Sequence, residues 1–147
     1  MKRKGFTLIE LVFSIIIITL IALLIICFVK PSKKISLSRD AQRYDDVKKL
    51  AEAVNLYLAN GSNFDNLTGP YSSIKKEGKD WIPLKLDNQP VDPVNNTVYN
   101  YRLAVSVSKK TYEINAIFEN DQNFSKAQND NGNSSTAFEL GTDLTIL

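Results

Sequence analysis

An uninterrupted apolar run near the N-terminus constrains this 147-residue chain more than any other feature. Residues 11–29 read LVFSIIIITLIALLIICFV and carry no charge, and only Ser14 and Thr19 among them are polar. A helix rises about 1.5 Å per residue, so the run is long enough to cross a hydrocarbon core about 30 Å thick. The sequence therefore predicts a membrane-spanning helix followed by one soluble domain with a single core.

Two other kinds of segment combine basic residues with such a run. A cleaved secretory signal peptide fits poorly, because its apolar part is about 7–15 residues long and ends at small residues, which residues 27–31 (CFVKP) do not offer. A plain signal anchor fits better. Charge alone does not orient the helix, since each flank carries three basic residues, Lys2, Arg3 and Lys4 before it and Lys30, Lys33 and Lys34 after it.

Composition removes most catalytic chemistry. The chain has no histidine, and its one cysteine, Cys27, lies in the apolar run. A Ser-His-Asp or Cys-His arrangement and a Cys/His zinc site are therefore excluded, and with no glycine-rich phosphate loop either, we expect no enzyme. The net charge is +2, from 18 basic and 16 acidic residues, which gives no reason to expect nucleic acid as a partner.

Glu10 is the unusual residue of the lead-in. It is a single carboxylate at the start of an otherwise apolar helix, and a charge inside a bilayer costs roughly 2.5 to 3.5 kcal/mol on insertion scales. Such residues usually have a partner. The simpler alternative is that Glu10 lies near the lipid headgroups and snorkels toward them.

The stretch KGFTLIE at residues 4–10, followed by the apolar run, resembles the prepilin leader of type IV pilins, type II secretion pseudopilins and competence pilins. The resemblance implies that a prepilin peptidase cuts between Gly5 and Phe6 and methylates the new amino group of Phe6. It also implies that the Glu10 carboxylate meets the Phe6 amine of a neighbouring subunit during assembly. The leader would then comprise residues 1–5 and the transmembrane assembly helix residues 6–29.

Residues 30–60 predict an amphipathic helix that ends at Asn60-Gly61. Its apolar positions recur at three- and four-residue steps and are Ala41, Tyr44, Val47, Leu50, Ala51, Val54 and Leu58. Charged residues are expected on the other faces of the helix, and the neighbouring Asp45 and Asp46 indicate a face in contact with solvent. Pro31 either kinks the helix, leaving a rod over residues 6–60, or separates anchor from domain.

Residues 61–147 predict the globular part. Turn signals make residues 61–97 a connecting segment with one short helix or strand, held against the helix by Trp81, Ile82 and Leu84. Alternation then predicts a β-hairpin, with strands at 99–107 and 112–118 and a turn at 108–110. A third strand is expected near 137–140 or 143–147. The predicted fold class is α+β and pilin-like, a long N-terminal helix on a small antiparallel sheet.

The loop at residues 120–136 contains the sequence NDNGNSS at 129–135. Its oxygens suit calcium, and the resemblance implies that some pseudopilins bind calcium in their C-terminal region. The spacing does not match an EF-hand, however, and Asn, Gly and Ser form turns without a ligand. We therefore expect no cofactor, with calcium in this C-terminal loop as the alternative.

The resemblance implies a structural subunit of a type IV pilus or a type II secretion pseudopilus-like filament. Its partners would be further copies of itself in a helical homopolymer, the prepilin peptidase, an assembly ATPase and a platform protein. It would cross the inner (cytoplasmic) membrane once, with its C-terminal domain outside, and then enter a filament at the cell surface or in the periplasm. The alternative is a signal-anchored extracytoplasmic binding protein that does not polymerise.

Overall fold

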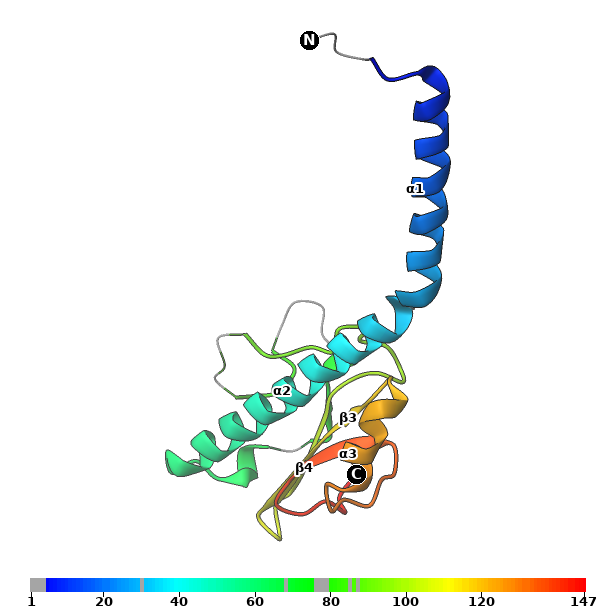
Figure 1. Cartoon of the computed structure of the whole chain (residues 1–147). Coiled ribbons are helices and arrows are strands. Elements are labelled where there is room, and N and C mark those ends of the chain that lie inside the picture. The colour runs from blue at the N-terminus through cyan, green and yellow to red at the C-terminus, as the bar shows by residue number, and fades with distance from the viewer. Residues whose placement is uncertain (1–4, 30, 68, 76–79, 85, 87) are drawn as a thin grey trace. The chain divides into compact units, whose positions relative to one another are not determined.

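A computed structural model describes residues 5–29, 31–67, 69–75, 80–84, 86 and 88–147 (Figure 1). The chain divides into two compact units, Met1–Ile35 and Ser36–Leu147. It contains a long apolar helix, further helices and a four-stranded antiparallel sheet. The predicted α+β, pilin-like fold class is thereby confirmed.

The first two helices are α1 (Leu8–Val29) and α2 (Pro31–Ala59). The question of a kink or a break at Pro31 falls on Lys30, which lies outside the described residues. The predicted end of the amphipathic helix is confirmed, because α2 stops one residue before Asn60. Gly61 then adopts a φ of +78°, which glycine reaches without a steric penalty, and its N–H donates to the carbonyl of Leu58.

The sheet has the strand order β1-β2-β3-β4, and all its pairs are antiparallel. Its strands are β1 (Tyr71–Ser72), β2 (Arg102–Ser106), β3 (Thr111–Ile117) and β4 (Ala137–Gly141). The predicted hairpin is β2–β3, and β4 is the third strand at the first of its two expected places. β1 adds a short edge strand next to β2. Residues 143–147 form no strand.

Short helical turns fill the connections. They are the 3₁₀ turns η1 (Phe64–Asn66), η2 (Ser73–Lys75) and η3 (Asp121–Asn123), and the one-turn helix α3 (Phe124–Gln128). The hairpin strand predicted to begin at Tyr99 begins three residues later. The reason is local, because the Asn96 side chain accepts the N–H groups of Val98 and Tyr99 and so holds this stretch in a turn.

The core lies between α2 and one face of the sheet. Leu50 and Val54 of α2 are buried in one cluster with Leu103 of β2 and Ile114 of β3. The predicted anchors of the connecting segment belong to it as well, since Trp81, Ile82 and Leu84 are all buried. The side chain of Gln89 holds that segment in place. It hydrogen-bonds the N–H groups of Trp81 and Ile82 and the carbonyls of Ile82 and Leu84.

Two predictions about the faces of α2 were wrong. Ala41, placed on the core face, is exposed, whereas Asp46, placed on a solvated face, is 5% exposed and accepts the Tyr101 hydroxyl at 2.9 Å. Asp40 and Arg43 are buried as well. The buried stripe therefore begins with charged residues, which apolar periodicity cannot reveal.

Arg43 is the centre of a buried charge network. Its guanidinium is fully buried and contacts Asp40 at 2.8 Å, Asp92 at 2.6 Å and Glu119 at 2.6 Å. Arg39 forms a second ion pair with Glu119. Burial opposes the charge of Arg43, but the hydrogen bonds that its guanidinium donates to the three carboxylates outweigh this effect and raise its pKa. The network joins α2, the segment around Asp92 and the end of β3.

Replacing Arg43 by alanine is expected to lower the free energy of unfolding by about 3–5 kcal/mol, because it leaves buried carboxylates without their cation. Lys109→Ala removes an exposed pair with Asp143 and is expected to cost at most about 1 kcal/mol. Urea unfolding in detergent micelles, followed by the fluorescence of Trp81, measures both. Equal losses from the two variants would contradict the role of Arg43.

The network also predicts loss of stability in acid. Burial raises the pKa values of Asp92 and Glu119, but hydrogen bonds from the arginines, and for Asp92 also from backbone N–H groups, bring both below their ordinary values. A depressed folded-state pKa stabilises the protein above the unfolded-state value, so this contribution disappears as the pH falls below about 4. Urea unfolding from pH 7 downward measures the slope, which Asp92→Asn should reduce. An unchanged slope in that variant would refute the assignment.

Candidate functional site

The start of α1 forms a reciprocal hydrogen-bonded cap between Thr7 and Glu10. The backbone N–H of Glu10 donates to the Thr7 hydroxyl oxygen at 3.3 Å. In return, the backbone N–H and the hydroxyl of Thr7 donate to Glu10 Oε2 at 3.2 and 3.1 Å. The amide of Leu11 donates to the Thr7 carbonyl and closes the first turn. This is a capping box, in which Thr7 is the N-cap and Glu10 the third helical residue.

The cap gives Glu10 partners within its own chain. Both donors are neutral groups, so the carboxylate is hydrogen-bonded without a compensating positive charge. The prediction for Glu10 considered only a neighbouring subunit or the lipid headgroups. The spacing Thr-x-x-Glu just before an apolar run was the sequence signal that indicates this local partner.

The other polar groups of the apolar run bond to their own helix. Ser14 donates its hydroxyl to the carbonyl of Glu10 at 2.7 Å, and Thr19 donates to the carbonyls of Ile15 and Ile16 at 3.0 and 2.8 Å. Such bonds let hydroxyls sit in an apolar environment. Glu10 is the one carboxylate among residues 5–29. These residues contain no lysine or arginine that could neutralise its charge.

The apolar surface of α1 faces outward on all sides. Residues Leu8–Phe28 are long and apolar enough to cross a membrane, and none of this span is buried within the chain. Its isoleucine and leucine side chains are about half exposed or more. A surface of this kind is stable only in lipid or against other helices.

Gly5 and Phe6 lie just before the cap. The Phe6 side chain is 74% exposed. A Cβ atom added to Gly5 would meet no other atom within 4 Å, so nothing within the described chain requires glycine at this position. The structure thus brings Gly5, Phe6 and Glu10 into one short stretch, with Glu10 held by Thr7. Lys2, Arg3 and Lys4 lie outside the described residues.

A family model describes this same stretch. The model of the prokaryotic N-terminal methylation motif matches residues 1–26. The chain carries a prepilin-type signal. The signal is that of type IV pilins and pseudopilins, a structural and non-enzymatic family, and together with the exposed apolar helix it indicates a membrane-anchored protein. No curated protein and no solved structure matches the chain.

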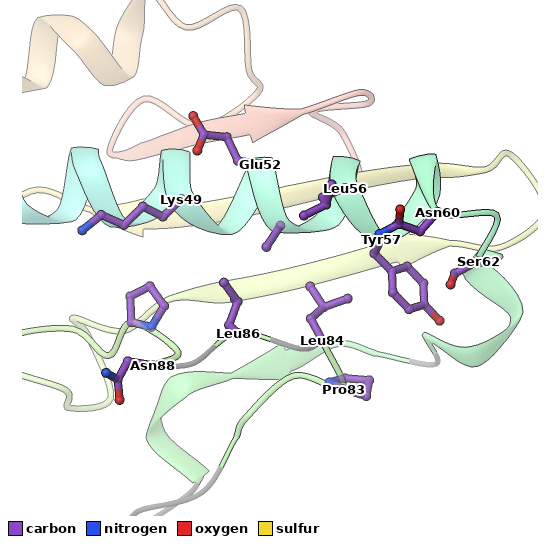
Figure 2. Close-up of a pocket in the computed structure, with 12 residues that line it drawn as sticks. Lys49, Glu52, Leu56, Tyr57, Asn60, Ser62, Pro83, Leu84, Leu86 and Asn88 are labelled. Carbon is purple, nitrogen blue, oxygen red and sulfur yellow. The ribbon is translucent and has the colours of Figure 1, made fainter.

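A separate groove lies in the second unit. It is a cavity of about 600 Å³ between the C-terminal half of α2 and the segment at residues 83–90. Figure 2 shows Leu56 and Tyr57 facing Leu84 and Leu86 across it. Polar residues stand at its rim, among them Lys49, Glu52, Asn60, Ser62 and Asn88.

The loop considered for calcium is held by its own hydrogen bonds. Asp130 accepts the N–H of Gly132 at 2.8 Å and the N–H of Glu139 at 2.7 Å. Within the described part of the chain, no group of three or more His, Cys, Asp or Glu side chains is arranged to hold a metal ion. The Asp130 carboxylate thus shapes the turn.

Thr7→Ala is expected to loosen the first turn of α1, because it removes both bonds made by the hydroxyl. A lost cap costs about 1 kcal/mol. Hydrogen exchange of the Glu10 and Leu11 amides in micelles, read by NMR, should therefore be about fivefold faster than in the unchanged protein. Thr7→Ser keeps the hydroxyl and serves as the matched control. Equal exchange rates in the two variants would show that the cap is not formed.

Proposed function

We propose that the chain is a structural subunit of a type IV pilus or a type II secretion pseudopilus-like filament. The observation that supports this most directly is the prepilin-type signal, which continues into a helix with no face buried in its own chain. In the membrane, lipid covers that helix. In a filament, the helices of neighbouring subunits would cover one another instead.

Processing would come first. A prepilin peptidase would cut between Gly5 and Phe6 and methylate the Phe6 amine. The open surroundings of Gly5 support this, because an extended backbone without a side chain is easily reached by a protease. The cut would place a positively charged amine one residue before Thr7, close in sequence to the capping box.

Assembly would then use Glu10. Its carboxylate would exchange the neutral donors of Thr7 for the methylated Phe6 amine of a neighbouring subunit. An opposite charge within about 4–6 Å favours the ionised carboxylate, and in an apolar environment it also removes the cost of a net charge. A subunit would thus be stabilised most in the axial position that brings the two groups together.

The wider setting follows from the signal. We propose that the protein is inserted once in the inner (cytoplasmic) membrane with its C-terminal domain outside. An assembly ATPase and a platform protein would move it into a filament at the cell surface or in the periplasm. With Cys27 as its one cysteine, the chain lacks the C-terminal disulfide loop of many Gram-negative pilins, which favours a pseudopilin or a pilin of another lineage.

No resident cofactor is proposed. Calcium at the C-terminal loop, around Asp130, stays a prediction of the pseudopilin alternative. Thermal melting with and without a chelator tests it, because a bound ion would raise the melting temperature. An unchanged melting temperature removes the calcium argument for a pseudopilin.

A second candidate function is a signal-anchored binding protein that does not polymerise. The groove between α2 and residues 83–90 favours it, because apolar walls with a polar rim are typical of ligand sites. Mass spectrometry of the membrane-extracted protein separates the two. A chain that begins at N-methylated Phe6 supports the filament subunit, and an intact Met1 in a host with the peptidase supports the anchor.

Gly5→Ser is expected to leave the precursor uncut, because the serine side chain obstructs access to the backbone. The mass of the membrane-extracted protein then stays that of the full chain. Ser14→Ala changes a residue bonded to its own helix and should be processed normally. Normal cleavage of Gly5→Ser would contradict the processing proposal.

Glu10→Ala is expected to permit membrane insertion and cleavage but to reduce filament formation at least about tenfold, because the pairing charge is lost. Filaments sheared from the cells are measured against the membrane pool of subunits. Thr7→Ala separates the two roles of Glu10, since it removes the cap and keeps the carboxylate. A normal yield of filaments from Glu10→Ala would contradict the pairing proposal.

A further inference from the structure

Two carboxyl groups are buried on the face of the sheet that points away from α2. Glu113 of β3 is 0% exposed and Glu139 of β4 is 1% exposed. Leu103 and Ile114 pair across the strands on the core side, so Glu113, which precedes Ile114, points to the opposite side. Buried carboxyl groups without a cation beside them are rare and need an explanation.

Segments of the chain's own C-terminal part cover this pair. The N–H groups of Ile146 and Leu147 donate to Glu113 Oε2 at 2.6 and 3.0 Å. The N–H of Ser134 donates to Glu139 Oε2 at 3.0 Å. A Cβ added to Gly132 would lie 1.6 Å from that same oxygen, so the loop packs directly on the carboxyl group. Residues 129–136 and 142–147 therefore form a lid over the pair.

The hydrogen bonding of the pair is incomplete as long as both groups are ionised. Glu113 Oε1 is buried and has no donor. Glu139 Oε1 receives a long contact of 3.5 Å from the Asn115 amide. Burial raises the pKa of Glu139, and the adjoining Glu113 carboxylate and the charge of Asp130 raise it further. The hydrogen bond from the Ser134 N–H lowers the pKa of Glu139, but the other effects outweigh it, so the balance favours a proton on Glu139.

We propose that Glu139 carries a proton and donates it to Glu113 Oε1, and that this shared proton fastens residues 129–136 and 142–147 to the sheet. The proton supplies the donor that Glu113 Oε1 lacks. The pair then holds one negative charge in place of two. That charge lies on Glu113, where the N–H groups of Ile146 and Leu147 accommodate it.

The other charged groups nearby set the direction of the pH effect. Asp130 and Asp143 add negative charge from the covering segments, and Asp143 is paired with Lys109. Arg102 lies on the same face of the sheet, opposite Asn115, and its side chain is exposed. Among the described residues the carboxylates therefore outnumber the cations on this face, which favours retention of the proton.

The consequence is a latch that opens as the pH rises. A group whose folded-state pKa is raised stabilises the fold fully below its unfolded-state pKa, and this stabilisation is lost as the pH rises through the folded-state value. Loss of the proton leaves two buried like charges. The core on the other face contains neither carboxyl group, so the covering segments are released first.

The test uses the full chain in detergent micelles and follows the carboxyl carbon of Glu139 and the amides of Ile146 and Leu147 by NMR. Glu139 is expected to titrate at a higher pH than an ordinary glutamate, whose pKa is about 4.3. Above that pH, protection of the two amides, corrected for intrinsic exchange, should fall about tenfold per pH unit. Titration of Glu139 at or below that ordinary glutamate value would overturn the proposal.

Glu139→Gln provides the sharper comparison. Its amide can donate to Glu113 Oε1 at any pH, so Ile146 and Leu147 should stay protected and lose their pH dependence. Glu52→Gln is the matched control and should leave that dependence unchanged. Loss of protection at every pH in Glu139→Gln would overturn the shared proton. A shift of both carboxyl resonances on addition of calcium chloride at neutral pH would also overturn it, because the pair would then hold a cation.

Discussion

The exposed apolar surface of α1 is the constraint from which the rest of the molecule follows. Leu8–Phe28 turn apolar side chains outward on every side, and none of them is buried within the chain. The hydrophobic effect therefore acts on this helix through its surroundings and not through its own fold. Lipid meets that requirement for a single subunit, and a bundle of identical helices meets it equally well. In the proposed filament, the helix would exchange the first of these environments for the second.

The globular unit places its buried charges on two sides of one sheet. On the α2 side, Arg43 is matched by carboxylates, and this network needs those carboxylates ionised. On the far side, the described residues place no cation beside Glu113 and Glu139, and the proposed arrangement needs one of them protonated. A falling pH weakens the Arg43 network, and a rising pH weakens the Glu113–Glu139 pair. The unit should therefore be most stable at a pH between these two titrations. The α2 side of the sheet is then destabilised first in acid, and the far side is destabilised first when the pH rises.

The sequence predicted those features that depend on periodicity or on local turn chemistry. The apolar run, the end of α2 near Gly61 and the β2–β3 hairpin are of this kind, and so is the burial of Trp81. The buried positions of Asp40, Arg43 and Asp46 were missed, because their partners lie up to 83 residues away and polar residues are assigned to the surface by default. The burial of Glu113 and Glu139 was missed for the same reason. At the N-terminus, the Thr-x-x-Glu spacing of the cap was missed, because Glu10 was interpreted by its charge alone.

The observed partner of Glu10 and the partner proposed for it in a filament differ in kind, and in that proposal the difference gives the carboxylate its role. Thr7 supplies two donors and satisfies the geometry of the oxygen, but it contributes no positive charge, so the helix still carries a net charge into an apolar environment. An ammonium group supplies both a donor and the missing charge. A partner shifts an equilibrium only by as much as it prefers one state over the other, and here the preference arises from charge and not from the number of hydrogen bonds. A glutamine at this position would keep the cap, and a neighbouring amine would then gain little by docking beside it. In the proposed assembly the acid is needed, because the described residues of its own chain leave its charge unneutralised.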